Sequence, residues 1–319
     1  MLPSIAGFDP NREMDGYEYD EEKAHRASSF FPECLKHVKN SRFTRAADPF
    51  VLNAWQKTFI ELLFGIVDTK TGLRRFKTAY CEVPRKNGKT TMAAGIALYG
   101  LFADNEDGAE CYCAAGSRDQ SSLLFDIAAG MVRKNQAFSV ASTIKESIKR
   151  IVYKASYIRA VASDAHTLHG QNAHICVADE VHAWAKGGYD LWEVLETGAA
   201  SRAQPIMAGI TTAGFDKQTK CWDLHEYAAS VRDGTINDPS FLPVIYGAEH
   251  DEDWRSPEVW AKANPNLGVS IPVEYLQQKS KQAEANPNFQ NAFRRLHLNQ
   301  WTSQRNRWFD MSAWDACES

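Results

Sequence analysis

The sequence predicts an α/β protein built on a mostly parallel β-sheet with helices on both faces. Between residues 50 and 250, short apolar segments alternate with longer segments of helical periodicity. The short segments are apolar throughout, which is typical of parallel strands buried on both faces. The 319 residues are 44% hydrophobic and 24% charged, as in ordinary globular proteins, and the length allows about two domains.

Charge and cysteine content exclude several classes of protein. Lys and Arg number 36 against 40 Asp and Glu, so the chain is not a basic nucleic-acid coat, although residues 74–91 and 277–307 are locally basic. The seven cysteines show no paired CxxC spacing, and the N-terminus lacks a signal peptide. The longest run without a polar side chain, 92–103, is too short to cross a bilayer. We therefore expect no membrane association and a reducing cytosol.

The elements follow from this periodicity. Residues 1–49 are polar and predict an arm or helical cover outside the core, residues 50–248 predict the sheet core, and residues 249–319 predict a lid or linker, including helices at Val273–Glu284 and Asn288–Leu298. The other expected helices are Asp20–Phe30, 52–67, Lys89–Phe102, Gln120–Lys134, Asp190–Ala200 and Thr219–Ser230. The expected strands are Phe76–Val83, Ala109–Ala115, His174–Asp179, Ile206–Thr212 and Phe241–Tyr246, with a hairpin at 149–161.

One segment between a predicted strand and a predicted helix has the composition of a phosphate-binding loop. It reads Val83-Pro84-Arg85-Lys86-Asn87-Gly88-Lys89-Thr90-Thr91. Such a loop needs backbone N–H groups at a helix N-terminus, a lysine for the β- and γ-phosphates, and a hydroxyl for Mg²⁺. The pattern departs from G-x4-GK[ST] because Val83 replaces the first glycine. We expect Lys89 to face solvent; the alternative is a basic turn that caps a helix.

Two later strands end on groups that such a loop would need. The segment ending at Asp179 and Glu180 has the Walker B pattern, in which Asp179 would hold Mg²⁺ and Glu180 would polarise the attacking water. Thr211 and Thr212 end the next strand and would lie near the γ-phosphate, because ligands bind at the carboxyl ends of strands in open α/β sheets. The combination predicts a P-loop NTPase of the catalytic-glutamate, RecA-like type.

The order of these motifs resembles the large terminase subunits of tailed double-stranded DNA bacteriophages, the ATPases that pump DNA into procapsids. The likeness extends from about Phe30 to Trp314. It rests on Trp55-Gln56, PRKNGKTT, ICVADE and TTAG, and on the flanking phrases TGLRRF, WAKANPN and LNQW. The departure at Val83 and the arginine inside the loop are typical of that family.

The resemblance implies a role for each matching residue. Gln56 would contact adenine with Trp55 beside it, and Arg85 would stabilise the γ-phosphate. Thr211 and Thr212 would begin a coupling motif that links hydrolysis to DNA movement. The remaining expected nucleotide contacts and Mg²⁺ ligands are Pro84, Lys86, Asn87, Gly88, Lys89, Thr90, Thr91 and Asp179.

The resemblance also implies partners: double-stranded DNA, the portal protein, the small terminase subunit, and further copies of the chain in a ring, expected to be a pentamer. The protein would work in the host cytoplasm, docked transiently on the procapsid portal. Family members usually carry a C-terminal nuclease domain; only three acids follow Leu298, so we expect this domain to be absent and no nuclease activity.

A ring motor would also use an arginine that reaches a neighbouring subunit's site. Arg202 is our candidate, placed near the carboxyl edge of the sheet, with Arg118 as the alternative. Arg202 could equally cap the preceding helix.

Two rival functions remain at this stage. A helicase or other P-loop DNA translocase would share the core, but a helicase needs a second motor domain and about 70 residues after Ala248 are too few. A nucleotide-binding switch without turnover would not need Glu180.

Overall fold

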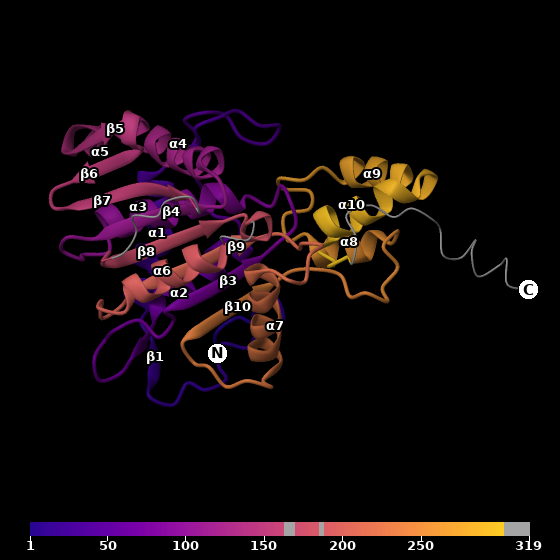
Figure 1. The fold of residues 1–319 in the computed structure, drawn as a ribbon, viewed down its shortest axis with the longest axis horizontal. Helices are drawn as coiled ribbons and strands as arrows, with labels where there is room; N and C mark the ends of the chain where they lie inside the picture. The colour runs from indigo at the N-terminus through magenta and orange to yellow at the C-terminus, as the bar shows by residue number, and fades with distance from the viewer. Residues whose placement is uncertain (163–169, 185–187, 303–319) are drawn as a thin grey trace, which may run out of the picture.

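The computed structural model describes residues 1–162, 170–184 and 188–302. Figure 1 shows a twisted sheet with its covering helices and, beside it, a smaller cluster of helices. The eight-stranded sheet has the order β10-β3-β9-β8-β4-β7-β6-β5. The first six strands in this order are parallel, and β6 and β5 join one edge as an antiparallel hairpin.

The predicted strands are confirmed, with small shifts of their ends. The strands are β3 (Thr78–Glu82), β4 (Glu110–Ala115), β6 (Arg150–Tyr153), β7 (Ser156–Ala162), β8 (Ala173–Asp179), β9 (Ile206–Thr211) and β10 (Phe241–Ile245). The sequence analysis missed β5 (Ser142–Lys145) and the short helix α5 (Gln136–Ala141) before it. β5 alternates half-buried and exposed residues at the sheet edge, so its hydrophobic signal is weak.

Helices cover both faces of the sheet, as expected. One face packs against α1 (Glu21–Cys34), α2 (Ala54–Gly65), α3 (Lys89–Phe102) and α4 (Arg118–Lys134). The other packs against α6 (Gly188–Ala199) and α7 (Lys220–Asp233), with Tyr80 and Tyr112 in this second core. Both faces are therefore buried, which explains why the central strands are apolar at every position.

The N-terminal segment was predicted to be an arm or a helical cover outside the core; α1 does cover the sheet, but its aromatic side chains are part of the core. Phe30, Phe31 and Leu35 are buried in the same cluster as α3, and Phe31 fits against Gly95, where even a Cβ atom would collide with its ring. Two further strands, β1 (Tyr17–Tyr19) and β2 (Ile66–Asp68), pair antiparallel. Because β2 begins at Ile66, α2 ends at Gly65, earlier than the periodicity suggested. The burial of Phe30 and Phe31 was not predicted because the residues around them are mostly polar.

The three helices after the sheet form a lid with a small core of its own. They are α8 (Pro257–Ala263), α9 (Val273–Ala285) and α10 (Pro287–Leu298), and they pack around Trp254, Trp260 and Phe293. Figure 1 shows the lid beside the ends of β3, β9 and β10. Among the helices of the described residues, none combines the length and the hydropathy needed to cross a lipid bilayer.

Candidate nucleotide-binding and catalytic site

Three neighbouring strands bring the predicted site residues to one edge of the sheet. β3 leads into the Val83–Gly88 loop, β8 ends at Asp179, and β9 lies between them and ends at Thr211. All three strands are parallel, so their carboxyl ends meet at the same edge. The loop, the carboxyl groups of Asp179 and Glu180 and the two threonines therefore lie at the same edge of the sheet.

The loop holds its lysine inward, whereas we expected Lys89 to face solvent. Its side chain is 5% exposed, and its Nζ donates to the carbonyl oxygens of Val83 at 2.7 Å and Pro84 at 3.2 Å. Burial lowers the pKa of Lys89, although the carboxylates of Glu180 and Asp179 oppose this effect. The ammonium group thus lies inside the curve of the loop.

Asp179 is a buried carboxyl group beside the start of α3. The Thr90 hydroxyl donates a hydrogen bond to it, and its Oδ1 accepts from the backbone N–H of Glu180 at 3.0 Å. Burial raises the pKa of Asp179 to about 7, and the charge of Glu180 adds to the rise. Asp179 and Thr90 thus lie together, as the predicted Mg²⁺ ligands require.

Glu180 begins a short turn in an uncommon backbone conformation. Its φ is +51°, in the left-handed region, and its side chain is only partly exposed. Its Oε2 lies 3.1 Å from His182 Nδ1 and 3.4 Å from the Thr212 hydroxyl. Burial alone would raise the pKa of Glu180, but the His182 hydrogen bond and the charges of Lys89 and Arg85 outweigh it and lower this pKa to about 2. Glu180 is therefore ionised near neutral pH.

His182 is a site residue that the sequence analysis missed. Its Nδ1 lies 3.1 Å from the Thr211 hydroxyl and its backbone N–H donates to the same oxygen at 3.0 Å. Thr211 and Thr212 are both fully buried. A histidine two positions after the Walker B pair was the available signal, but its contact with Thr211 depends on β9 lying next to β8.

Asn87, one of the expected nucleotide contacts, is joined to the lid by two asparagines that were not predicted, Asn264 and Asn266. The side chain of Asn87 is fully buried and donates to Pro84 O at 3.0 Å and to Asn264 Oδ1 at 3.1 Å. Asn87 Oδ1 accepts from the backbone N–H of Asn266 at 3.1 Å, and Asn266 Nδ2 donates to Asn87 O at 3.0 Å. The phrase WAKANPN contained the signal, but 177 residues separate Asn87 from Asn264.

Two further hydrogen bonds join the loop to the lid. The backbone N–H of Arg85 donates to Leu296 O at 2.9 Å, and the Ser270 hydroxyl donates to Lys86 O at 2.7 Å. The segment after residue 248 is thus part of the site and not only a linker.

A cavity of about 670 Å³ adjoins the loop on the side of α2. Gln56, Gly88 and Thr91 line it, together with Lys86, Val269, Ser270 and residues 37–41, 43, 44 and 48–51 of the N-terminal segment. Gln56 is buried; its amide donates to Gly88 O at 3.3 Å and its Oε1 accepts from the backbone N–H of Asn53. Gln56 is therefore a buried residue held between the N-terminus of α2 and the loop, not an ordinary surface residue of that helix.

Trp55 has a different place from the one we expected. It is not among the residues that line the cavity beside Gln56. Its Nε1 donates to Asn266 Oδ1 at 3.0 Å, and its ring meets Tyr246 edge to face. Trp55 therefore supports the lid segment that holds Asn87.

Arg85 is exposed on the lid side of the loop. It lies close enough to the carboxylates to lower the pKa of Glu180, and it also lowers the pKa of the buried His297, after burial itself, to about 4. Arg85 and Lys86 line a second cavity, between α9 and α10. Arg85 thus lies close both to Glu180 and to the lid.

The prediction for Arg202 is wrong in its placement. This residue precedes β9, so it lies at the amino edge of the sheet, opposite the P-loop. Its guanidinium donates to Gly108 O at 2.6 Å, Asp107 O at 3.2 Å and Glu106 Oε1 at 2.8 Å. It also does not cap α6 through its side chain; it joins the loops that precede β4 and β8.

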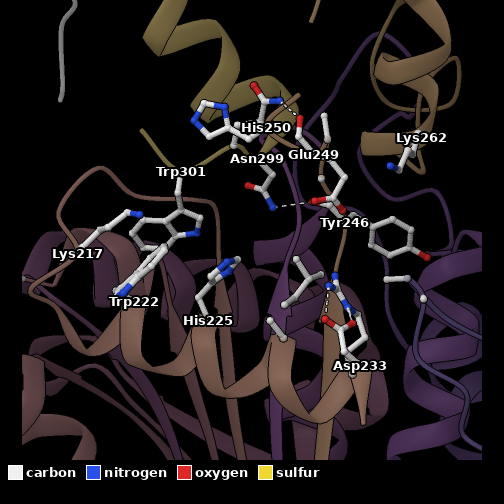
Figure 2. A pocket seen from close by; sticks show the side chains of 18 residues that line it. Lys217, Trp222, His225, Asp233, Tyr246, Glu249, His250, Lys262, Asn299 and Trp301 are labelled. Carbon is white, nitrogen blue, oxygen red and sulfur yellow. Dashed lines mark hydrogen bonds and ion pairs between the residues drawn. The ribbon is translucent and has the colours of Figure 1, made fainter. Parts of the chain in front are cut away.

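The chain leaves the lid along a cleft beside α7. Figure 2 shows the Trp301 indole next to Trp222, with His225 on the same wall. Asn299 Oδ1 accepts from the backbone N–H of Ala213 at 2.8 Å, directly after the two threonines. Trp301 Nε1 donates to the buried carboxylate of Glu82 at 3.3 Å, one residue before the P-loop. Residues 299–301 therefore contact both the P-loop strand and the segment after β9.

Two family models match successive segments of the chain. The family model of the terminase large subunit ATPase domain matches residues 54–230, more than half of the chain. The model of the terminase large subunit endonuclease domain matches residues 235–319. The expectation that no nuclease part is present is therefore wrong. This match begins at residue 235, before β10 of the sheet. The acids that follow Leu298 are therefore only part of those in the matched segment.

Two curated relatives match the sequence. Protein YmfN of Escherichia coli K12 is 32% identical over 177 residues, covering 56% of this chain and 38% of that protein. The terminase large subunit of Enterobacteria phage HK97 is 26% identical over 273 residues, covering 84% of this chain and 52% of that protein. The chain thus spans about half or less of the length of these relatives.

The fold is also that of a solved terminase. The crystal structure of the HK97 large terminase superposes with a TM-score of 0.75 at 24% identity, over 92% of this chain and 58% of that one. This chain belongs to the terminase large subunit family, and residues 54–230 are its ATPase domain.

Proposed function

We propose that this protein is the ATP-hydrolysing motor of a viral terminase and that it moves double-stranded DNA into a procapsid. The observation that carries the proposal is the meeting of Lys89, Asp179 and Glu180 at one edge of the sheet. A phosphate-binding lysine, a metal-binding carboxyl group and an ionised base in this arrangement serve phosphoryl transfer to water.

Each part of the nucleotide has a place in this proposal. The adenine would occupy the cavity lined by Gln56, because an amide side chain can both donate to and accept from the base. The phosphates would follow the loop from Asn87 to Thr91, where backbone N–H groups open α3. Lys89 would leave the carbonyl oxygens of Val83 and Pro84 and bind the β- and γ-phosphates. Arg85 would stabilise the γ-phosphate from the lid side.

Glu180 is placed to act as the general base. Its carboxylate is ionised because its pKa is lowered to about 2, so it can accept a proton from water at neutral pH. Thr212 contacts the same carboxylate and would lie next to the γ-phosphate. Loss of the γ-phosphate on hydrolysis would therefore change the contacts of Thr212, directly after β9.

The residues present fit a magnesium ion. The Thr90 hydroxyl and the buried Asp179 carboxylate are hard oxygen donors that already lie within hydrogen-bond reach of each other. Asp179 would hold the ion through its water, and Thr90 would bind it directly. Bound there, Mg²⁺ would neutralise charge on the β- and γ-phosphate oxygens.

The partners follow from the family. We propose a ring of subunits, expected to be a pentamer, that docks on the portal of the procapsid in the host cytoplasm and receives DNA with the small terminase subunit. A helicase-like translocase and a nucleotide switch without turnover are the alternatives. An ionised Glu180 beside the phosphate site favours turnover over a switch.

ATP turnover by the whole chain tests the proposal. We expect phosphate release from Mg·ATP by the wild type and none by Lys89→Ala, which also takes from the Val83 carbonyl oxygen its hydrogen bond to Lys89 and lowers the free energy of unfolding by about 1–3 kcal/mol. Glu180→Gln should bind radiolabelled ATP at equilibrium and keep it unhydrolysed, because the amide cannot accept the proton.

Glu196→Gln, an exposed glutamate on α6, is the matched control and should hydrolyse ATP at the wild-type rate. Wild-type turnover by Glu180→Gln would place the base elsewhere. ATP binding without turnover by the wild type, in the presence of DNA, would favour the switch.

A further inference from the structure

His182 occupies the space between the catalytic glutamate and the two threonines. Its ring nitrogen Nδ1 lies 3.1 Å from Glu180 Oε2 and 3.1 Å from the Thr211 hydroxyl oxygen. The side chain is 8% exposed, so its polar atoms depend on protein partners.

The hydrogen-bond pattern fixes which ring nitrogen carries the proton. The Thr211 hydroxyl has one hydrogen, which it donates to Thr212 O at 3.0 Å. Its oxygen therefore accepts from the backbone N–H of His182 and from the ring. Nδ1 must then be the protonated nitrogen, and it lies 3.1 Å from the carboxylate oxygen Oε2 of Glu180.

The backbone of Glu180 makes such support necessary. A left-handed conformation is unfavourable for a residue with a side chain and persists only when its surroundings hold it. The turn Val181–Ala183 follows directly, and its backbone is attached to β9 through the bond from His182 to Thr211. The direction of the Glu180 side chain is thus set by the neighbouring strand.

We infer that His182 is the positioning residue of the catalytic glutamate and that it ties Glu180 to Thr211 so that both move together. This inference rests on the proposed function, in which Glu180 activates water. The tie has a second consequence, because Ala213 follows these threonines and bonds to Asn299 of the exit segment. A shift of that segment would change the orientation of the base.

Two amide substitutions separate positioning from simple packing. The Nδ2 of an asparagine takes the place of histidine Nδ1, whereas the Nε2 of a glutamine takes the place of histidine Nε2. We expect His182→Ala to lower kcat by about 10- to 100-fold, since a misplacement of about 1 Å costs this much, with the ATP dissociation constant within about threefold of wild type. His182→Asn should recover most of kcat, and His182→Gln should not.

Thr211→Val gives a second measurement. It removes the hydroxyl that accepts from His182, so its effect on kcat should not add to that of His182→Ala. The inference is overturned if His182→Ala keeps the wild-type kcat, if asparagine and glutamine act alike, or if ATP binding falls as much as kcat. A wild-type chain that lacks turnover altogether would refute the proposed function first, and the Lys89→Ala comparison identifies that case.

Discussion

Asp179 is a carboxyl group in surroundings that favour its protonated form. Burial and the adjacent Glu180 raise its pKa to about 7, against about 3.8 in an unfolded chain. Between these values the folded protein binds more protons than the unfolded one, so the free energy of unfolding falls as the pH rises from about 4 to 7. The pKa of Glu180 is lowered to about 2, so the protonation of Glu180 changes the free energy of unfolding only at more acidic pH.

Replacing this carboxyl group should stabilise the protein without nucleotide. Asp179→Asn keeps the acceptor for the Glu180 N–H but removes the charge, so we expect a gain of about 1–3 kcal/mol at pH 8 and almost none at pH 4. Urea unfolding of both proteins in EDTA at the two pH values measures this. An equal difference at both pH values would show that charge is not the cause. The variant should hydrolyse no ATP.

At the residue scale, the sequence predicts site residues whose place follows from the order of strand, loop and helix. It does not predict a contact such as that of His182 with Thr211, which exists because two strands are neighbours in the sheet. Lys89, Thr90, Asp179 and Glu180 follow from strand, loop and helix order alone. The inward position of Lys89 did not, because it depends on carbonyl oxygens that the folded loop presents. Arg202 was misplaced although parallel strands put any residue that precedes a strand at the amino edge.

At the scale of elements, the lid and the phosphate loop share their hydrogen bonds. In many P-loops a first glycine helps to shape the turn, and here Val83 stands in that position. The buried Asn87, held by Asn264 and Asn266, shapes the loop instead. Sequence periodicity gave α9 and α10, but no local pattern could show that the segment before α9 binds a loop so far away in the chain.

Loss of one lid asparagine should therefore weaken nucleotide binding. Asn266→Ala leaves Asn87 O and Trp55 Nε1 without partners in the interior, so we expect a loss of about 1–3 kcal/mol for each group and a weaker ATP affinity. Equilibrium binding of an ATP analogue and thermal unfolding measure both effects. Asn288→Ala, an exposed asparagine of the same lid, is the control. Unchanged ATP affinity despite lower stability would show that the lid does not shape the loop.

At the scale of the whole molecule, the candidate site lies at one edge of the sheet, and the contacts of Arg202 lie at the opposite edge. Arg118 opens α4 directly after β4, so it is exposed at the carboxyl edge, and Arg202 is at the amino edge. If subunits assemble in a ring, Arg118 is the better placed of the two to reach a neighbour's nucleotide.

Mixing two inactive proteins tests this placement. Arg118→Ala keeps its own base, and Glu180→Gln keeps the arginine, so mixed rings should hydrolyse more ATP than the sum of the separate proteins, since an arginine supplied in trans adds about 10³–10⁵ in rate. Phosphate release under assembly conditions measures it. Full activity of Arg118→Ala alone, or no recovery on mixing, would rule the arginine out. Arg202→Ala, our control, should retain turnover but melt at a lower temperature.

The hydrogen bonds between the lid asparagines and the phosphate loop also determine which fragment of the protein can keep the loop in its folded shape. The matched ATPase segment ends at residue 230, yet the loop inside it is completed by the carbonyl oxygen of Leu296, and Asn264 is held by that of His297. A fragment cut between the sheet and the lid would keep every Walker residue and still present an unsupported Asn87. The smallest piece that retains a shaped loop therefore extends through α10, so the boundary drawn by sequence similarity and the boundary drawn by hydrogen bonding are about 70 residues apart.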